Sequence, residues 1–372
     1  MFIIPSRTGL LIAIALFAVL LLGSPVGAEK NCQAGYWIVN TYDISQEEGA
    51  CPSRLKFRCY YKPNCGKMRR VSYSQMQRSL NPAAATCIMV HGSSVGVDTA
   101  IMDANNTYSW IKKGAPGCAL NMIFFVWPGD ESLLGFTSRN VKKNGIIAAQ
   151  NGIYLGHLID RIPSSSPVCL LGHSHGARTV VAALHYRGGG RVNGVCKGNR
   201  SGKRPCRAVL AAAAINHMWL NPNNKYGLAV SQVDKLLNIV NRRDMALALY
   251  PLAAVSNGRA FAKTGLTRSD KKKLGHYACR VHELDATSVI GFRHTWPNYY
   301  GRPELAKIIA PYVYSKGRHR HHSNSYTDNV DSSQESTDAE IVLPELLAAD
   351  EVTVAKVPAI PPVALDQTVI TK

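Results

Sequence analysis

The segment Gly172-His173-Ser174-His175-Gly176 decides how the fold of this 372-residue chain is interpreted. It follows the apolar residues 168–171 and precedes the helix-like residues 177–186. This order predicts a strand, a sharp turn and a helix, with Ser174 at the tip of the turn. Glycines fit both flanks, because the strained turn leaves no room for side chains against the crossing strand and helix. The alternative is a glycine-rich turn that merely contains a serine.

A serine hydroxyl is a poor nucleophile at neutral pH, so Ser174 would need a histidine base and a carboxylate that fixes the tautomer of that histidine. In this layout the carboxylate comes next along the chain and the histidine comes last. Asp244 directly follows a buried-strand pattern at residues 236–240 and a turn at residues 241–243. It is therefore predicted at the carboxyl end of a strand, where open α/β sheets bind their ligands. The alternative is a helix N-cap aspartate.

The predicted base is His294, which lies in the turn-rich residues 291–297, just before the last predicted helix. A histidine on that loop can reach over the turn that carries the serine. Two other histidines follow the predicted acid and are alternatives. His276 would lie at the start of the preceding strand, at the far edge of the sheet, and His282 would lie within that strand.

Two backbone N–H groups are needed to stabilise the oxyanion that develops on a substrate carbonyl. The first is predicted to be the amide of His175. The second should come from the loop that follows the predicted strand 86–90, and Ser93 is the predicted donor, with Ser94 as the next choice. Gly92 and Ser94 are predicted to lie against the substrate, because small residues let the backbone approach it. A glycine-rich turn without a ligand is the alternative.

These motifs together resemble the α/β-hydrolase superfamily. The resemblance rests on five segments, namely Val90-His91-Gly92, residues 124–128, residues 172–176, residues 241–247, and His294 with Tyr299-Tyr300 behind it. More narrowly, the chain resembles an uncharacterised bacterial α/β-hydrolase family with a Trp-Pro-Ser strand end, a His-Ser-x-Gly turn and an Asp-x-Ala-Leu segment. The similarity covers roughly residues 34–315 and implies a serine hydrolase whose substrate is not specified.

The chain departs from that family at two positions. Gly129 stands where a serine usually follows Trp-Pro, and Asn216-His217 stands at a strand end where the family tends to have an aspartate. The first change is expected to alter a turn, and the second to reshape a wall of the site. Trp127, at the strand end, is predicted to contact the substrate, together with three other aromatic residues, Trp219, Trp296 and Tyr299. Aromatic residues of this kind are more often part of the core.

Apolar runs bounded by turn signals predict strands that alternate with helices. The strands are predicted at residues 36–39, 56–60, 87–90, 122–127, 168–171, 208–214, 236–240 and 279–282, and the helices at 98–112, 141–162, 177–186, 229–235 and 303–314. This alternation predicts an α/β fold with a doubly wound, mainly parallel sheet, the α/β-hydrolase fold. The fold is predicted to form a single catalytic domain at residues 29–315, which is large enough to bury a sizeable core.

Both ends of the chain are predicted to lie outside this domain. Residues 1–28 have the pattern of a signal peptide: Arg7, an apolar run at 10–22, and small residues before a cleavage site after Ala28. The run is short for a membrane span, which needs about 20 residues. The protein is therefore expected to be exported, periplasmic or secreted, with an uncleaved N-terminal anchor as the alternative. Residues 316–372 are rich in Ser, Thr, Asp, Glu and Pro and are predicted to be a disordered, low-complexity tail.

The ten cysteines fit an oxidising compartment. Cys196 and Cys206 flank a Gly/Lys/Arg loop that a disulfide would close. Cys87 and Cys169 lie on neighbouring predicted strands and are expected to be buried thiols. No pair of cysteines has metal-ligand spacing, so no metal is predicted. The two histidines beside the serine suggest a metal less well than they fit the turn, and no organic cofactor is expected either.

Charge is unevenly distributed along the chain. The formal net charge is +19, and residues 323–372 hold nine acids and two bases, which leaves +26 on residues 1–322. A basic exported protein can bind an anionic polymer or membrane surface, although a solvated surface is the alternative. Nucleic acid is not expected as a partner, because no recognition motif is present.

The sequence therefore predicts an exported serine hydrolase, similar to an esterase or lipase, with Ser174, Asp244 and His294 as its triad. The substrate would be a small-molecule or lipid ester, thioester or amide. Two alternatives remain. One is an acyltransferase that uses the same triad, and the other is a non-catalytic module that binds an anionic envelope or extracellular surface.

Overall fold

The computed structural model describes residues 35–50, 55–129, 138–197, 206–250, 258–314 and 341–342. The predicted signal peptide, and the predicted tail apart from its residues 341–342, lie outside the described residues. Both segments, and the domain boundaries drawn from them, stay predictions.

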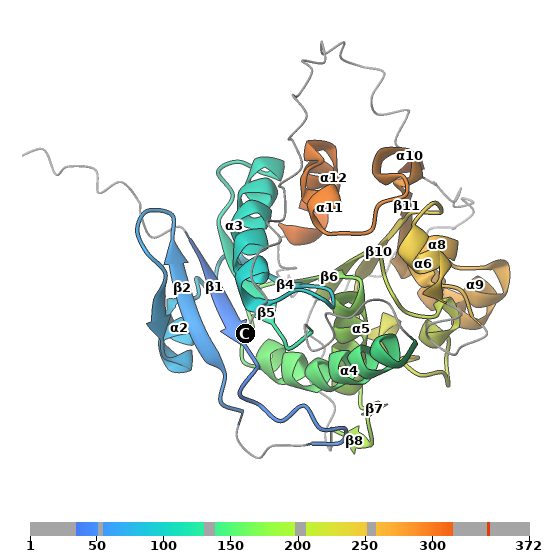
Figure 1. The fold of residues 1–372 in the computed structure, drawn as a ribbon, viewed down its shortest axis with the longest axis horizontal. Helices are drawn as coiled ribbons and strands as arrows, with labels where there is room; N and C mark the ends of the chain where they lie inside the picture. Colours follow the sequence, from blue (N-terminus) through green and yellow to red (C-terminus); the bar gives the residue numbers. More distant parts are fainter. Residues whose placement is uncertain are drawn as a thin grey trace, which may run out of the picture.

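A ten-stranded sheet runs through the described chain, in the order β12-β11-β10-β9-β6-β4-β5-β1-β2-β3 (Figure 1). Its strands are β1 (Gly35–Asn40), β2 (Arg58–Pro63), β3 (Arg69–Val71), β4 (Ala85–Val90), β5 (Leu120–Val126), β6 (Val168–His173), β9 (Cys206–Ala211), β10 (Lys235–Val240), β11 (Val281–Asp285) and β12 (Ile341–Val342). Neighbouring strands from β12 to β1 are parallel, and β2 and β3 continue the sheet antiparallel. A separate antiparallel pair joins β7 (Arg191–Val192) and β8 (Val195–Cys196).

Helices cover both faces of this sheet (Figure 1). Helices α3 (Val97–Gly114) and α12 (Pro303–Val313) pack together on one face, and α4 (Ser138–Asp160) and α5 (His175–Arg187) pack together on the other. Each pair approaches closely at a glycine: a Cβ on Gly114 would collide with the backbone of Ala306, and one on Gly152 with the side chain of Ala182. The predicted doubly wound, mainly parallel α/β sheet is confirmed.

The central strands are buried along their whole length, which explains their composition. Every residue of β4 and β6 is buried. Strands covered by helices on both faces need continuous apolar runs rather than alternation. These runs made the central strands predictable. Among the described residues, no helix combines the length and the apolar character that are needed to cross a lipid bilayer.

The remaining helices are short and lie mostly in the second half of the chain. They are α2 (Tyr73–Ser79), α6 (Met245–Ala248), α8 (Phe261–Thr264), α9 (Arg268–Leu274), α10 (Thr287–Ile290) and α11 (Pro297–Tyr300), with the 3-10 turns η1 (His217–Leu220), η2 (Val230–Gln232) and η3 (Gly275–Arg280). The predicted helix at 229–235 is wrong. Only η2 forms there, because the amide of Asp234 already donates to the carbonyl of Cys206 and the chain enters β10 at Lys235. The predicted strand at 279–282 starts only at Val281, because η3 occupies the preceding residues.

The two predictions made for cysteines have different outcomes. Cys87 and Cys169 are register partners on β4 and β6, and both are buried free thiols as predicted. The disulfide that would close the loop between Cys196 and Cys206 is not seen among the described residues. Cys206 is buried at the start of β9, whereas the exposed Cys196 directs its Sγ to the carbonyl of Gly189.

Candidate active site

Ser174 lies between β6 and α5 in a strained conformation. Its φ of 54° and ψ of −120° lie in a region that non-glycine residues rarely adopt. The turn is held from β9, since the amide of Ser174 donates to the carbonyl of Ala211 at 2.9 Å. Strain of this kind persists where surrounding contacts fix it, and it is frequent at functional sites. The predicted strand, sharp turn and helix are present.

The two glycines of the turn are required by packing. A Cβ on Gly172 would come within 2.7 Å of the Cα of Ala177 in helix α5. A Cβ on Gly176 would collide with the carbonyl of Val90 at the end of β4. Both approaches are to backbone atoms, which cannot move aside. The predicted collisions with the crossing strand and helix are therefore observed.

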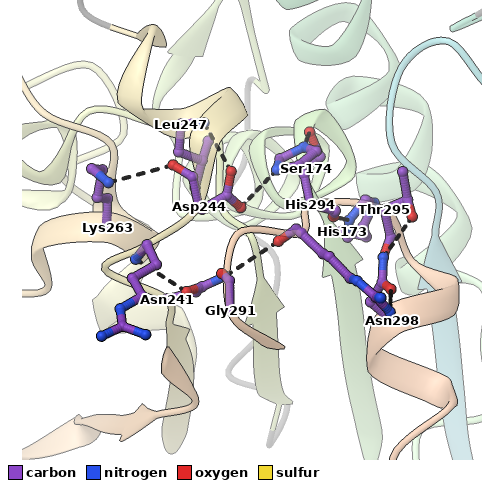
Figure 2. A network of polar contacts seen from close by, with 12 residues as sticks. His173, Ser174, Asn241, Asp244, Leu247, Lys263, Gly291, His294, Thr295 and Asn298 are labelled. Atoms are coloured by element: carbon purple, nitrogen blue, oxygen red, sulfur yellow. Dashed lines mark hydrogen bonds and ion pairs between the residues drawn. The ribbon is translucent and has the colours of Figure 1, made fainter. Parts of the chain in front are cut away.

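Three side chains that are distant in sequence meet at this turn (Figure 2). The Oγ of Ser174 lies 3.0 Å from Nε2 of His294, and Nδ1 of His294 lies 2.8 Å from Oδ2 of Asp244. Because a carboxylate only accepts hydrogen bonds, Nδ1 carries the proton and Nε2 presents its lone pair to the serine hydroxyl. The structure thus brings together the three residues that the sequence nominated as a triad.

Asp244 has two tasks at once. It is fully buried, and it caps helix α6 through its Oδ1, which accepts the amide N–H of Leu247 at 2.9 Å. Its other oxygen faces His294. The two interpretations of this aspartate in the sequence, helix N-cap and acid partner, are compatible. With both oxygens bonded, the carboxylate is fixed in one orientation.

The loop that carries His294 is held through its backbone carbonyls (Figure 2). His173, at the end of β6, donates from Nε2 to the carbonyl oxygen of His294 at 2.8 Å. Asn241, just after β10, donates from Nδ2 to the carbonyl oxygens of Gly291 at 2.8 Å and Arg293 at 3.2 Å. Both side chains are buried. His173 and Asn241 thus link the loop that carries His294, called the base loop below, to the strand ends that carry the serine and the acid.

His173 is neutral in this position. Burial and, as a smaller cause, the neighbouring His294 lower its pKa to about 3. Its ring lies against two aromatic side chains, with ring centroids 5.6 Å from Trp296 and 5.8 Å from Tyr299. Trp296 and Tyr299 are themselves buried, so their aromatic surfaces support the base loop rather than an open pocket.

Trp127, which is predicted to contact the substrate, packs against His91 inside the fold. It is fully buried, its indole N–H donates to the carbonyl of His91 at 2.9 Å, and its backbone amide donates to Nε2 of His91 at 3.2 Å. The two rings are stacked with centroids 5.6 Å apart. Trp127 therefore anchors the loop after β4 to the end of β5. From the sequence alone, a tryptophan at a strand end fits a loop anchor and a substrate contact equally well.

The predicted oxyanion residues lie side by side. His175 opens helix α5, so its amide belongs to the first turn, whose N–H groups have no partner within the helix. The Oγ of Ser93 lies 2.9 Å from Nδ1 of His175. Burial lowers the pKa of His175 to about 3, and the nearby Arg178 contributes, so this ring is also neutral. The roles of both amides stay predictions.

Gly92 and Ser94, the two small residues predicted to lie against the substrate, have different contacts. A Cβ on Gly92 would lie 3.1 Å from the Cβ of Ser174 and 2.9 Å from Nδ1 of His173, so the backbone at Gly92 closely approaches the nucleophile candidate. Ser94 has a φ of 59°, and its amide already donates to the carbonyl of Gly129 at 2.6 Å. Ser94 therefore fixes the loop, and its amide is not available as the second oxyanion donor.

A largely aliphatic pocket opens beside the serine. It has about 370 Å³ of empty space, part of which is open to solvent. Besides Ser174, His175 and His294, it is lined by Val141, Ala214, Ala246, Leu247, Leu249 and Tyr250. Such a lining favours an apolar group in contact with the nucleophile.

Two other acids that follow Ser174 in the chain, Asp270 and Glu283, have other partners. Asp270 binds Nδ1 of His217 at 2.7 Å and the side-chain amide of Asn221 at 2.6 Å. Glu283 accepts the amide of Leu266 at 2.6 Å. His282 lies on β11 as predicted, and His276 lies in η3 rather than at a strand start. Within the described part of the chain, no three His, Cys, Asp or Glu side chains converge as metal ligands.

No model of a protein family matches this chain, and no curated protein matches it. Solved structures that resemble it include esterase B from Lactobacillus rhamnosis, at 12% identity and a TM-score of 0.33, covering 81% of this chain and 90% of that one. Two inhibited forms of that esterase also match. The tributyrin phosphonate form (C4-C4) is 10% identical with a TM-score of 0.33, and the match covers 81% of this chain and 92% of that one. The C6-C4 form is 12% identical with a TM-score of 0.32, and the match covers 80% of this chain and 90% of that one.

Proposed function

We propose that this protein is a serine hydrolase that forms an acyl-enzyme on Ser174, with a carboxylic ester as its best substrate class and thioesters and amides as related ones. The observation that supports this most strongly is the relay from Ser174 through His294 to Asp244, with distances of 3.0 and 2.8 Å. The relay lies on a strained turn beside an aliphatic pocket. If Ser174 had no catalytic role, neither His294 nor Asp244 would be needed beside it.

In the first step, the Oγ of Ser174 bonds to the carbonyl carbon of the substrate while its proton moves to Nε2 of His294. Asp244 holds His294 in the tautomer that can accept this proton and stabilises the imidazolium that results. The bond between the carbonyl carbon and the leaving group then breaks, and the leaving group takes the proton from Nε2. The product is an ester between the acyl group and Ser174.

In the second step, water takes the place of the leaving group. His294 accepts a proton from the water as its oxygen bonds to the acyl carbon, and then returns that proton to Oγ as the acyl bond to Ser174 breaks. In both steps the amides of His175 and Ser93 would stabilise the oxyanion. Losing one such donor costs roughly a hundred- to a thousandfold in rate.

The pocket favours an apolar acyl group. Its aliphatic residues line the pocket that also contains the nucleophile, and Ala246 and Leu247 lie two and three residues after the aspartate of the relay. We also propose that the enzyme acts after export. That proposal depends on the signal-peptide pattern of residues 1–28, which lie outside the described residues.

Labelling with a fluorophosphonate tests the proposal. This reagent reacts with a serine only where a base activates it. The wild-type protein should carry one adduct on Ser174, and Ser174→Ala should carry none. Ser109→Ala is a matched control, because Ser109 is an exposed serine on α3 that binds only the carbonyl of Asn105. Folded wild-type protein without a label would favour a binding module over an enzyme. Labelled protein that transfers its acyl group to alcohols but not to water would indicate an acyltransferase.

A further inference from the structure

Exposed apolar side chains gather beside the acid and the base of the relay. Three of the exposed large hydrophobic residues in the described chain lie within five positions of Asp244 or His294. They are Met245, Leu249 and Phe292, with 58%, 54% and 65% of their surface exposed. Scattered exposed apolar residues are normal in proteins, but a group at the mouth of a pocket indicates a binding surface.

These three residues, called the apolar rim below, are connected in space to the pocket. The amide of Met245 donates to the carbonyl of Phe292 at 3.4 Å, so the start of α6 lies against the base loop. Leu249 follows α6 and lines the pocket that contains Ser174. Leu249 therefore belongs both to the rim and to the lining of the pocket.

Arginine side chains border the apolar rim. The guanidinium carbon of Arg243 lies 5.8 Å from the ring centroid of Phe292, and Arg242 and Arg293 are exposed on the same two segments. The half-buried Asp285 is paired with Arg242 at 3.1 Å. The relay aspartate is fully buried. Arg243 and Arg293 therefore leave positive charge at the rim, in a chain with a formal net charge of +19.

An apolar centre bordered by arginines matches one kind of partner, the surface of an anionic lipid layer. Apolar side chains enter the boundary between headgroups and acyl chains, while arginines remain at the level of the phosphates. An anionic polysaccharide would engage the cations but would leave Phe292, Met245 and Leu249 in water. Because Leu249 lines the pocket that contains Ser174, an acyl chain held at the rim would lie next to that pocket.

We propose that the apolar rim docks the protein on anionic lipid surfaces, and that its substrates are acyl esters presented at such surfaces. The statement about substrates rests on the proposed hydrolase function. The statement about docking does not, and it can be measured without any turnover.

Vesicle co-sedimentation tests the docking surface in the Ser174→Ala protein. The protein should sediment with vesicles of equal parts phosphatidylcholine and phosphatidylglycerol, and much less with phosphatidylcholine alone. Phe292→Asp should weaken binding about tenfold, because it removes an apolar contact and adds a like charge to the surface. Arg243→Glu should have a similar effect. Met245→Ser provides a second rim variant if Phe292→Asp does not fold, as judged by circular dichroism.

Lys113→Glu is the matched control for charge. Lys113 is exposed in the last turn of α3, which leads into the start of β5 and so lies at the opposite edge of the sheet from the relay. The proposal requires that Lys113→Glu binds as the parent protein does. Equal losses in Lys113→Glu and Arg243→Glu, with no loss in the rim variants, would overturn it in favour of diffuse charge attraction. Absence of binding to anionic vesicles would also overturn it, and would leave the hydrolase proposal intact. Vesicle binding by a wild-type protein that no fluorophosphonate labels would refute the hydrolase instead.

Discussion

Nε2 of His173 lies 2.8 Å from the carbonyl oxygen of His294, so the residue before the serine holds the backbone of the proposed base. This bond links the serine turn to the loop that carries His294 through a path separate from Ser174 itself. Since the ring of His173 is buried and neutral, the bond is a fixed donor to a fixed acceptor. A shift of about 1 Å in a catalytic group can cost roughly a hundredfold in rate.

His173→Phe should therefore lower kcat on a soluble ester by roughly ten- to a hundredfold, with little change in KM. Phenylalanine fills similar space but cannot donate to the carbonyl. His173→Gln, whose amide can donate, should recover most of the rate. Steady-state kinetics of both variants across a range of pH would check this. A His173→Phe variant that keeps the wild-type kcat and pH profile would mean that His173 only fills space.

Asn241 should contribute mainly to stability. Asn241→Ala removes the donor to two carbonyls of the base loop and leaves both of them without that partner. An unsatisfied buried acceptor costs about 1–3 kcal/mol, so the free energy of unfolding should fall by that order. Urea unfolding measures it. A variant as stable as the wild type would show that water replaces the side chain without loss.

The two tasks of Asp244 can be separated by substitution. Asp244→Asn should lower kcat by about ten-thousandfold, because an amide no longer fixes the tautomer of His294. Its stability should change little, since asparagine also caps helices. Asp244→Ala should lose the same rate and, in addition, about 1 kcal/mol of stability. Kinetics and thermal unfolding of the pair would check both. Near-wild-type turnover in Asp244→Asn would show that the acid lies elsewhere.

Acid should destabilise the fold through its buried histidines. Burial lowers the pKa of His173 and His175 to about 3, from an ordinary value of 6.5. Between these values the unfolded chain binds protons that the folded chain does not, so the free energy of unfolding decreases as pH falls below about 6.5. Each histidine contributes up to about 1.4 kcal/mol per pH unit.

His173→Gln should reduce this dependence by about that amount. Urea unfolding of wild type and variant at about pH 7, 6 and 5 provides the slopes. An unchanged slope in the variant would mean that His173 is protonated in the folded protein and that its pKa is not lowered.

Much of the site was predictable because its signals are local. The serine turn, the aspartate after β10 and the histidine before the last helix each follow from a short segment and its position at a strand end. The structure brings the three side chains together, and their catalytic roles stay predictions. The central strands were predictable for the same reason, since each is a single apolar run between turn residues.

Other features depend on contacts that leave no mark in a short segment. His173 holds a backbone carbonyl 121 residues away, which any residue type could supply. Trp127 binds His91, and a loop anchor and a substrate contact would both place a tryptophan at a strand end. The helix expected at 229–235 did not form beyond η2, because Asp234 bonds to Cys206 and Lys235 already pairs with Arg207 of β9.

Trapping the acyl-enzyme tests whether Ser174 is the nucleophile. Purified protein is mixed with a short-chain p-nitrophenyl ester, quenched in acid within the first turnover, and digested for mass spectrometry. One acyl group should appear on the peptide that contains Ser174, and it should accumulate in a variant with slow deacylation. Release of p-nitrophenol with no acyl group on Ser174, or with the acyl group on another residue, would contradict this role of Ser174.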